Sequence, residues 1–137
     1  MRILAIDHGT KRMGIAISDE LGVIAQPLEF IPAEPFMDFL ARLNEILKEK
    51  QVELILVGMP RNMNGSYGPA ALKVQEFVVM LKDAVTIPIQ TPDERLTSVQ
   101  AHRFLTDAEV SGRERRAKVD KSAAAVLLQS YLDSRTG

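Results

Sequence analysis

The chain opens with an apolar run that ends directly in an acidic residue. Residues 3–6 read "ILAI", Asp7 follows, and after a polar corner that starts at Gly9 residues 13–18 form a second apolar run. A strand that is apolar at every position belongs in the centre of a sheet, where both of its faces are covered. A lone carboxylate buried at the end of such a strand costs several kcal/mol unless something compensates its charge. The pattern therefore predicts a central strand over residues 2–7 and a partner for Asp7.

Turn and helix patterns divide the rest of the chain into short elements. Residues 9–12 predict a turn, which makes the first two apolar runs a hairpin. Pro27, in the third extended run, favours an edge position or a bulge for that strand. Apolar residues at helical spacing alternate with the later strands. The expected strands are residues 2–7, 13–18, 22–31, 53–57 and 85–91, and the expected helices are residues 36–47, 70–81, 97–107 and 119–133.

This order of elements predicts an α/β fold. Three consecutive strands form an antiparallel meander, and the later strands add to it in parallel, which gives a five-stranded mixed sheet flanked by helices. With 137 residues and neither a linker nor an internal repeat, the chain is expected to form a single domain over residues 1–137. In open sheets of this class, ligands bind beyond the carboxyl ends of the parallel strands.

The composition excludes several classes of site and protein. The chain has no cysteine, which excludes disulfides, thiolate metal sites and a cysteine nucleophile. No apolar run approaches the roughly 20 residues that a membrane-spanning helix needs, and the N-terminus does not read as a signal peptide. The formal net charge is −1, so a nucleic-acid partner has to be argued from local basic clusters.

Three acidic residues far apart in the sequence are candidates to meet at one edge of the sheet. Asp7 ends the first strand and Glu94 follows residues 85–91; if these strands are parallel neighbours, both carboxylates lie at the same edge. Asp120 heads the apolar stripe of the last predicted helix, which continues at helical spacing to Tyr131. Converging carboxylates repel one another unless a cation is present, and Mg²⁺ or Mn²⁺ prefers such oxygen ligands. The three acids therefore predict a divalent metal site, at which two ions can promote phosphodiester hydrolysis.

Each acid also has an ordinary structural explanation. Asp7 can cap a turn, Glu94 can pair with Arg95, and Asp120 can complement the dipole at a helix N-terminus. Taken singly, these explanations are more common than a catalytic role. The occurrence of all three acids at strand ends and on a buried stripe favours the metal site.

Four ordered motifs carry a family resemblance. They are "AIDHGTKRMGIAISD", "VGMPRNMNGSYG", "DERLTS" and "VDKSAAAVLLQSYL", and the resemblance covers residues 3–132. The motifs resemble the YqgF-type family, also called RuvX. The resemblance implies a ribonuclease H-like fold and a nuclease that processes the 5′ end of precursor 16S ribosomal RNA. Resolution of four-way DNA, the Holliday junction, is the alternative that analogy proposes for the family.

The resemblance also implies roles for individual residues and partners. Asp7, Glu94 and Asp120 match the family's catalytic carboxylates, which makes them the expected ligands of two Mg²⁺ or Mn²⁺ ions. Asp93 is the nearest candidate for a fourth acid, and His8 is given no role. The implied partners are RNA, in preference to branched DNA, and ribosomal assembly intermediates in the cytoplasm, with no membrane. Monomer and dimer both stay open.

Basic and amide side chains near the predicted acids are candidate phosphate contacts. Some lie on the first turn, in the long loop after the fourth strand and beside Glu94, and the others form a basic cluster that leads into Asp120. Solvated surface is the ordinary alternative for each of them. The candidates are Lys11, Arg12, Arg61, Asn62, Arg95, Arg113, Arg115, Arg116, Lys118 and Lys121.

Two other functions stay open at this point. The motif "DHGT" before a hairpin also resembles the phosphate loop of the actin and sugar-kinase superfamily, which implies a phosphotransferase or ATPase. Those proteins enclose a nucleotide between two such domains, whereas 137 residues supply one. A non-catalytic RNA-binding factor of ribosome assembly is the other alternative, because a fold does not guarantee activity.

Overall fold

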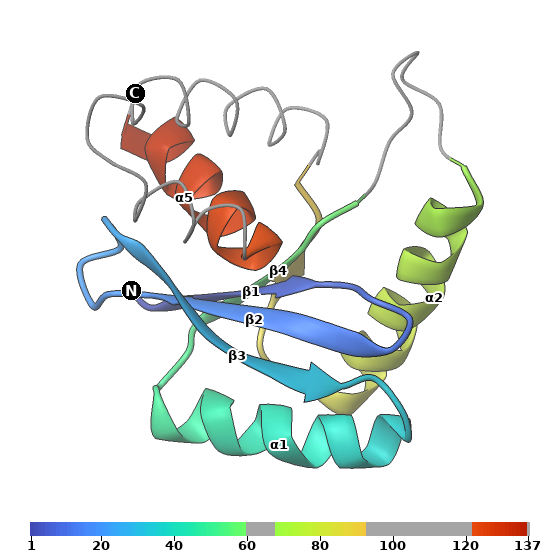
Figure 1. Ribbon diagram of the computed structural model, residues 1–137. Coiled ribbons are helices and arrows are strands. Elements are labelled where there is room, and N and C mark those ends of the chain that lie inside the picture. The colour runs from blue at the N-terminus through green and yellow to red at the C-terminus, as the bar shows by residue number, and fades with distance from the viewer. Residues whose placement is uncertain (60–67, 93–121, 137) are drawn as a thin grey trace.

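Five strands form one mixed sheet in the structure, a computed structural model that describes residues 1–59, 68–92 and 122–136 (Figure 1). The strands are β1 (Ile3–Asp7), β2 (Arg12–Ser18), β3 (Ala25–Pro32), β4 (Leu54–Val57) and β5 (Ile89–Gln90). Their order across the sheet is β3-β2-β1-β4-β5. The first three strands form an antiparallel meander, and β1, β4 and β5 run parallel. The predicted hairpin and the predicted mixed sheet are both confirmed.

The central strand is β1, as its sequence predicts. Its side chains alternate between two cores: Leu4 and Ile6 belong to the core on one face of the sheet, and Ile3 and Ala5 belong to the core on the other. All four are 0% exposed. Because both faces of β1 are covered, its first polar side chain is Asp7, at the point where the strand reaches the edge of the sheet.

Helices cover both faces of the sheet (Figure 1). On one face lie α1 (Phe36–Glu49) and α2 (Pro69–Ala84), and on the other lies α5 (Ala123–Thr136). The helices predicted over residues 36–47 and 70–81 are confirmed, although Ala70 is exposed and does not join the buried stripe of α2. Within the described ranges, no helix combines the length and the hydropathy that crossing a membrane requires.

The edge strand β3 carries a bulge. Ile15 on β2 pairs with Glu29, and the next residue, Ala16, pairs with Pro27, so Leu28 is an extra residue in the register. Pro27 has no N–H to donate, which suits it to such a position. The prediction made from this proline, an edge position or a bulge, is confirmed, and the structure has both features. Bulges and prolines also hinder an edge strand from pairing with another chain.

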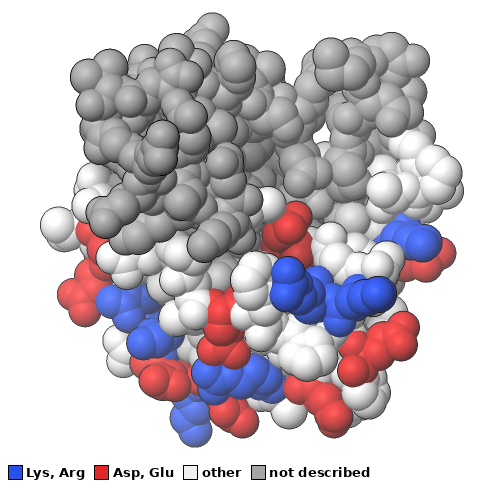
Figure 2. Space-filling model, viewed as in Figure 1, with Lys and Arg blue, Asp and Glu red and all other residues white. Residues whose placement is uncertain are grey.

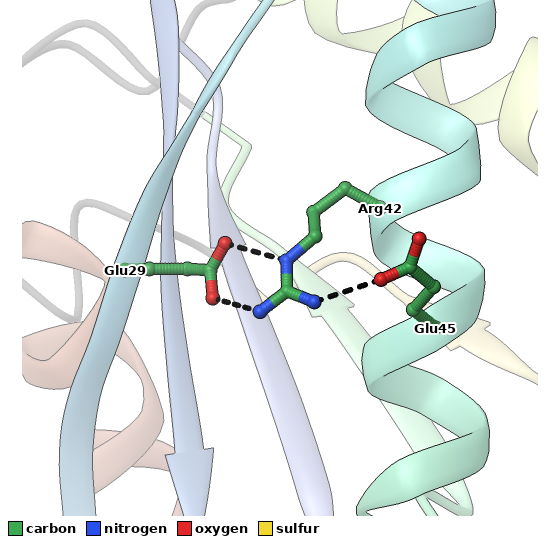
Figure 3. Close-up of polar contacts among 3 residues, drawn as sticks. All are labelled: Glu29, Arg42 and Glu45. Carbon is green, nitrogen blue, oxygen red and sulfur yellow. Dashed lines mark hydrogen bonds and ion pairs between the residues drawn. The ribbon is translucent and has the colours of Figure 1, made fainter.

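Polar side chains fasten β3 to the helices on both faces. Gln129 of α5 accepts the Ala25 N–H at Oε1, at 2.9 Å. On the other face, Arg42 of α1 donates two hydrogen bonds to Glu29, from Nε at 2.9 Å and from Nη2 at 2.6 Å (Figure 3). Its Nη1 donates a third bond to Glu45 at 3.0 Å. The position of this edge strand therefore depends on α1 and α5 as well as on β2.

The third strand starts at Ala25, three residues later than expected. Residues before it form a turn that the Asp19 carboxylate stabilises, since its Oδ1 accepts the N–H groups of Val23 at 2.7 Å and Ile24 at 3.0 Å. Gly22 has a φ of 71°, a conformation that glycine adopts without strain. The expected extension of the strand back to residue 22 is therefore wrong.

The fifth strand is shorter than predicted and has a different neighbour. Only Ile89–Gln90 of residues 85–91 form β5, between Pro88 and Pro92, which have no N–H to donate. This strand pairs with β4, so β4 separates it from β1. The sequence analysis placed Asp7 and Glu94 at one edge on the condition that their two strands are direct neighbours in the sheet. That condition is wrong, although β1 and β5 are parallel and end at the same edge of the sheet.

The last helix begins later than residue 119. Ser122 is not helical, and its Oγ accepts the Ala125 N–H at 3.1 Å, which makes Ser122 the N-cap of α5. Ala124, Leu127, Leu128 and Leu132 form its buried stripe, whereas Ala123 is exposed. Asp120 precedes this N-cap by two residues, so it does not head the stripe of α5; the residue itself lies outside the described part of the chain.

Candidate active site

Asp7 lies at the edge of the sheet where the three parallel strands end. Asp7 is paired with Gly14 of the neighbouring strand β2, and β4 is the neighbour on the opposite side of β1. Successive side chains of a strand alternate, so Asp7 is on the same side of β1 as Ile3 and Ala5, the side that α5 covers. In Figure 1 the N-terminal end of α5 lies toward the carboxyl end of β1. The candidate carboxylate thus lies at the carboxyl end of β1, on the face of the sheet that α5 covers.

An open cavity of about 330 Å³ adjoins this carboxylate. Asp7, His8 and Thr10 line it from the end of β1 and the following turn. Gly58 lines it from the end of β4, and the first two turns of α2 contribute Lys73 and further residues. The size is typical of a site for a small ligand or for part of a larger one. The cavity lies beyond the carboxyl ends of parallel strands, where the sequence predicts ligand binding.

The environment of Asp7 disfavours its charged form. The side chain is half-buried, and this burial raises the pKa of its carboxyl group, an effect that the neighbouring His8 partly offsets. Among the residues that the structure describes, no lysine or arginine forms a salt bridge with Asp7. Any cation that stabilises the ionised form of Asp7 would therefore come from outside this set of side chains.

His8 packs against a helix. Its ring centroid lies 5.2 Å from that of Phe77 on α2, with the two rings inclined by 58°. Burial lowers the pKa of His8; the charge of Asp7 raises it, and the charge of Lys73 lowers it further. The imidazole is therefore neutral at pH 7 and contributes packing and hydrogen-bonding capacity to the cavity rather than positive charge.

The turn after β1 depends on a glycine. A Cβ at Gly9 would lie 2.1 Å from the carbonyl oxygen of Arg12, so any side chain there would displace the backbone. Ala33 N–H donates to the carbonyl of Lys11 at 2.9 Å, which fixes the far side of the turn. The Arg12 guanidinium lies over the Phe30 ring, 4.4 Å from its centroid. Lys11 and Arg12 are exposed near the cavity but do not line it.

Most of the predicted site residues lie outside the described part of the chain. Over residues 1–59, 68–92 and 122–136, no group of three acidic or histidine side chains is arranged to hold a metal ion. The structure therefore describes one of the three predicted carboxylates, Asp7, and leaves the others as predictions. The predicted residues that fall outside the described ranges are Arg61, Asn62, Asp93, Glu94, Arg95, Arg113, Arg115, Arg116, Lys118, Asp120 and Lys121.

Sequence reasoning predicted Asp7 but missed the other residues of the cavity lining, among them Thr10 and Lys73. Thr10 belongs to the polar corner after Gly9, and Lys73 lies on the exposed side of α2, between the buried Ala71 and Val74. The available signal for Lys73 was its position near the N-terminus of a helix that follows a parallel strand, because such helix starts face the ligand-binding edge. Nothing in the local pattern distinguishes it from other exposed lysines.

Comparisons with known proteins agree with this architecture. A sequence model of the family described as "RuvX: Holliday junction resolvase" matches residues 1–134. A Desulforamulus reducens protein named "Putative pre-16S rRNA nuclease" is 48% identical over 134 residues, which cover 98% of this chain and 98% of that protein. A protein of the same name from a Geobacillus species is 46% identical over 137 residues, with coverage of 98% and 99%.

A solved structure is similar in fold. RuvC of T. thermophilus, in complex with a Holliday junction substrate, matches with a TM-score of 0.59 at 16% identity, over 100% of this chain and 96% of that chain. At this identity the match shows the fold alone, and with the strand order it confirms the predicted ribonuclease H-like α/β fold. The family match covers nearly the whole sequence and includes all four motifs. The chain therefore belongs to the RuvX family.

Proposed function

We propose that this protein is a metal-dependent endonuclease that hydrolyses nucleic-acid phosphodiesters, with Asp7, Glu94 and Asp120 as catalytic carboxylates and metal ligands. The observation that carries the proposal is the Asp7 carboxylate, half-buried at the carboxyl end of the central strand and beside a cavity. Burial raises its pKa. A nearby divalent cation would stabilise the ionised form and so offset this cost.

Chain connectivity supports a site shared by the three acids. Glu94 follows Pro92 by two residues, and the Pro92 carbonyl accepts the Met59 N–H at 3.4 Å, just beyond β4. Asp120 precedes Ser122, the N-cap of α5, by two residues. Two residues span at most about 7 Å. In the sequence, each acid is therefore only two residues away from a described residue, Pro92 after β5 or the N-cap of α5.

The donor set fits a hard divalent ion. Carboxylate oxygens are the ligands that Mg²⁺ and Mn²⁺ prefer, and we propose two such ions at this site, with Asp93 as the candidate for a fourth ligand. When bound, the ions would lower the pKa of water and neutralise charge on the phosphate. The chain itself contributes a carboxylate whose backbone is held, because β1 pairs with β2 on one side and with β4 on the other. The predicted basic residues would hold the phosphates of the substrate near it.

Precursor 16S rRNA is the substrate that we propose, which would place the protein in the cytoplasm with assembling ribosomes. The relatives whose name includes this activity align with the chain over 98% and 99% of their own lengths. A four-way DNA junction is the second candidate, because the family's description names a Holliday junction resolvase. A two-fold junction would call for a dimer, whereas trimming an RNA end would not.

A cleavage assay tests the proposal. The substrates are an rRNA fragment that carries the precursor 5′ end and a four-way DNA junction, each with Mg²⁺, Mn²⁺ or a chelator. We expect metal-dependent cleavage of the RNA, and a loss of at least about a hundredfold in Asp7→Asn, the usual scale for one catalytic group. Asp83→Asn, at an exposed position near the end of α2, is the matched control and should cleave normally.

The alternatives give different results in the same assay. RNA binding without metal-dependent cleavage would identify a non-catalytic assembly factor. ATP turnover would identify a phosphotransferase or ATPase. Cleavage of the junction alone would identify a resolvase. Undiminished cleavage in Asp7→Asn would remove this carboxylate from the mechanism.

A further inference from the structure

Lys73 and Thr10 approach the Asp7 cavity from two separate elements. Lys73 comes from the second turn of α2, and Thr10 comes from the turn between β1 and β2. Both side chains are exposed, so a solute in the cavity can reach them. Neither takes part in the carboxylate site proposed above.

Lys73 is the positively charged residue of this cavity. In the described part of the chain it forms no salt bridge, and the cavity lining there contains no other lysine or arginine. Figure 2 shows blue and red side chains intermixed over the described surface of the face in view. The basic side chains on this part of the face therefore stand among acidic ones and do not form a continuous basic surface. A lysine without a carboxylate partner beside an acidic site is suited to bind an anion.

The cavity has room for more than a phosphate. Its volume of about 330 Å³ is roughly ten times the 30 Å³ that a water molecule occupies in the liquid. Pro69 and Val74 add apolar surface beside Lys73. Beside Asp7 and His8, the described lining thus offers one lysine, one hydroxyl and an apolar wall, which suits a sugar-phosphate unit, in which charged and apolar surfaces alternate.

We propose that Lys73 and Thr10 bind a backbone phosphate of the nucleic acid that flanks the phosphate at Asp7. The Lys73 ammonium supplies charge and the Thr10 hydroxyl donates a hydrogen bond, so the strand is held on the α2 side of the carboxylate. The inference rests on the proposed nuclease function for the identity of the ligand. The contact orients the substrate, so Lys73 and Thr10 are positioning residues.

The test compares two lysines of the same helix. Lys73→Gln removes the proposed contact, and Lys82→Gln makes the same change in charge nine residues later. Nine residues are 2.5 helical turns, so Lys82 lies on the opposite side of α2 and about 14 Å along its axis. Binding of a fluorescein-labelled RNA stem with a single-stranded 5′ extension is measured by anisotropy in EDTA, between 20 and 200 mM KCl.

We expect Lys73→Gln to weaken binding about tenfold and to reduce the slope of log K against log salt by about 0.7 to 0.9. Lys82→Gln and Lys73→Arg should keep the slope of the unmodified protein. Thr10→Val should weaken binding without changing the slope, because it removes a neutral donor. Equal slopes for Lys73→Gln and Lys82→Gln would overturn the inference.

The unmodified protein is assayed in parallel for cleavage of the same RNA with Mg²⁺. Absence of cleavage there would contradict the proposed nuclease function and leave the binding comparison intact. Cleavage together with equal slopes would contradict the phosphate contact alone. The two proposals therefore fail in distinguishable ways.

Discussion

Gly14 of β2 lies directly opposite Asp7 of β1, and its lack of a side chain leaves space beside the carboxylate. A Cβ at Gly14 would lie 3.6 Å from the Asp7 Cβ and 3.3 Å from Cε1 of Phe30. The second of these contacts is tight but involves the far end of a ring on a residue that is 52% exposed. The glycine therefore shapes the site without being essential to the backbone.

Two glycines near the site should respond differently to the same substitution. Gly14→Ala should change the free energy of unfolding by less than about 1 kcal/mol, since the Phe30 ring can move. Gly9→Ala should destabilise the protein by about 2 kcal/mol or more, because the new Cβ would meet the Arg12 carbonyl oxygen at 2.1 Å. Urea unfolding of both variants checks this. A Gly9→Ala variant as stable as Gly14→Ala would contradict the geometry of the turn.

Neutralising Asp7 should stabilise the protein without metal. Burial raises the pKa of Asp7, so above that pKa the ionised carboxylate opposes folding, and the cost disappears as the pH falls and the group is protonated. Asp7→Asn should therefore raise Tm at pH 7 by up to about 3 °C in EDTA, a gain that fades toward pH 3. The measurement is thermal unfolding followed by circular dichroism.

Adding Mg²⁺ should reverse the order of the two Tm values, so that the unmodified protein becomes more stable than Asp7→Asn. A ligand that binds the folded state raises its stability, so Mg²⁺ should raise Tm of the unmodified protein and leave that of Asp7→Asn nearly unchanged. The same shift with Mg²⁺ in both proteins would show that the ion binds away from Asp7.

Acid should destabilise the protein partly through His8. Burial against Phe77 lowers the pKa of His8 in the folded protein, so the unfolded chain binds this proton more readily. The contribution of the neutral His8 to the free energy of unfolding is complete above about pH 6.5. It decreases as the pH falls from there toward the pKa of His8 in the folded protein. His8→Gln should reduce the difference in unfolding free energy between pH 7.5 and pH 5 by less than about 1 kcal/mol. An unchanged difference between the two pH values in His8→Gln would contradict this assignment.

The Glu29–Arg42 pair should contribute stability at neutral pH and lose it in acid. Hydrogen bonds from Arg42 lower the pKa of Glu29, so its stabilising effect is present above the usual glutamate pKa near 4.3 and is lost as the pH falls through the lower folded-state value. Glu29→Gln should cost about 0.5 to 1 kcal/mol at pH 7 and little at pH 2, since both side chains are partly exposed. Glu45→Gln, which removes a single bond from a side chain that is 66% exposed, should cost less. Urea unfolding at both pH values decides whether the cost depends on pH.

Local patterns predicted those features that depend on which face of an element is buried. The continuous apolar run before Asp7 predicted the central strand, because a strand covered on both faces tolerates no polar side chain. Pro27 predicted an edge position or a bulge, since it cannot donate a ladder hydrogen bond. The direction of β1 then fixed the end of the sheet at which the Asp7 carboxylate lies.

Sequence by itself thus determined the element types within the described ranges, the central strand, the family and the edge of the sheet that carries Asp7; the helix predicted over residues 97–107 lies outside those ranges. Only the tertiary structure decided that β4 lies between β1 and β5, that the last helix begins after Ser122, and that Lys73 shares a cavity with Asp7. Hydrophobic periodicity predicts that one face of an element is buried, but it does not predict which other element covers that face. The covering element depends on crossovers and on packing between segments that are distant in the sequence. Lys73 and Asp7 are 66 positions apart in the sequence, and no local pattern connects them.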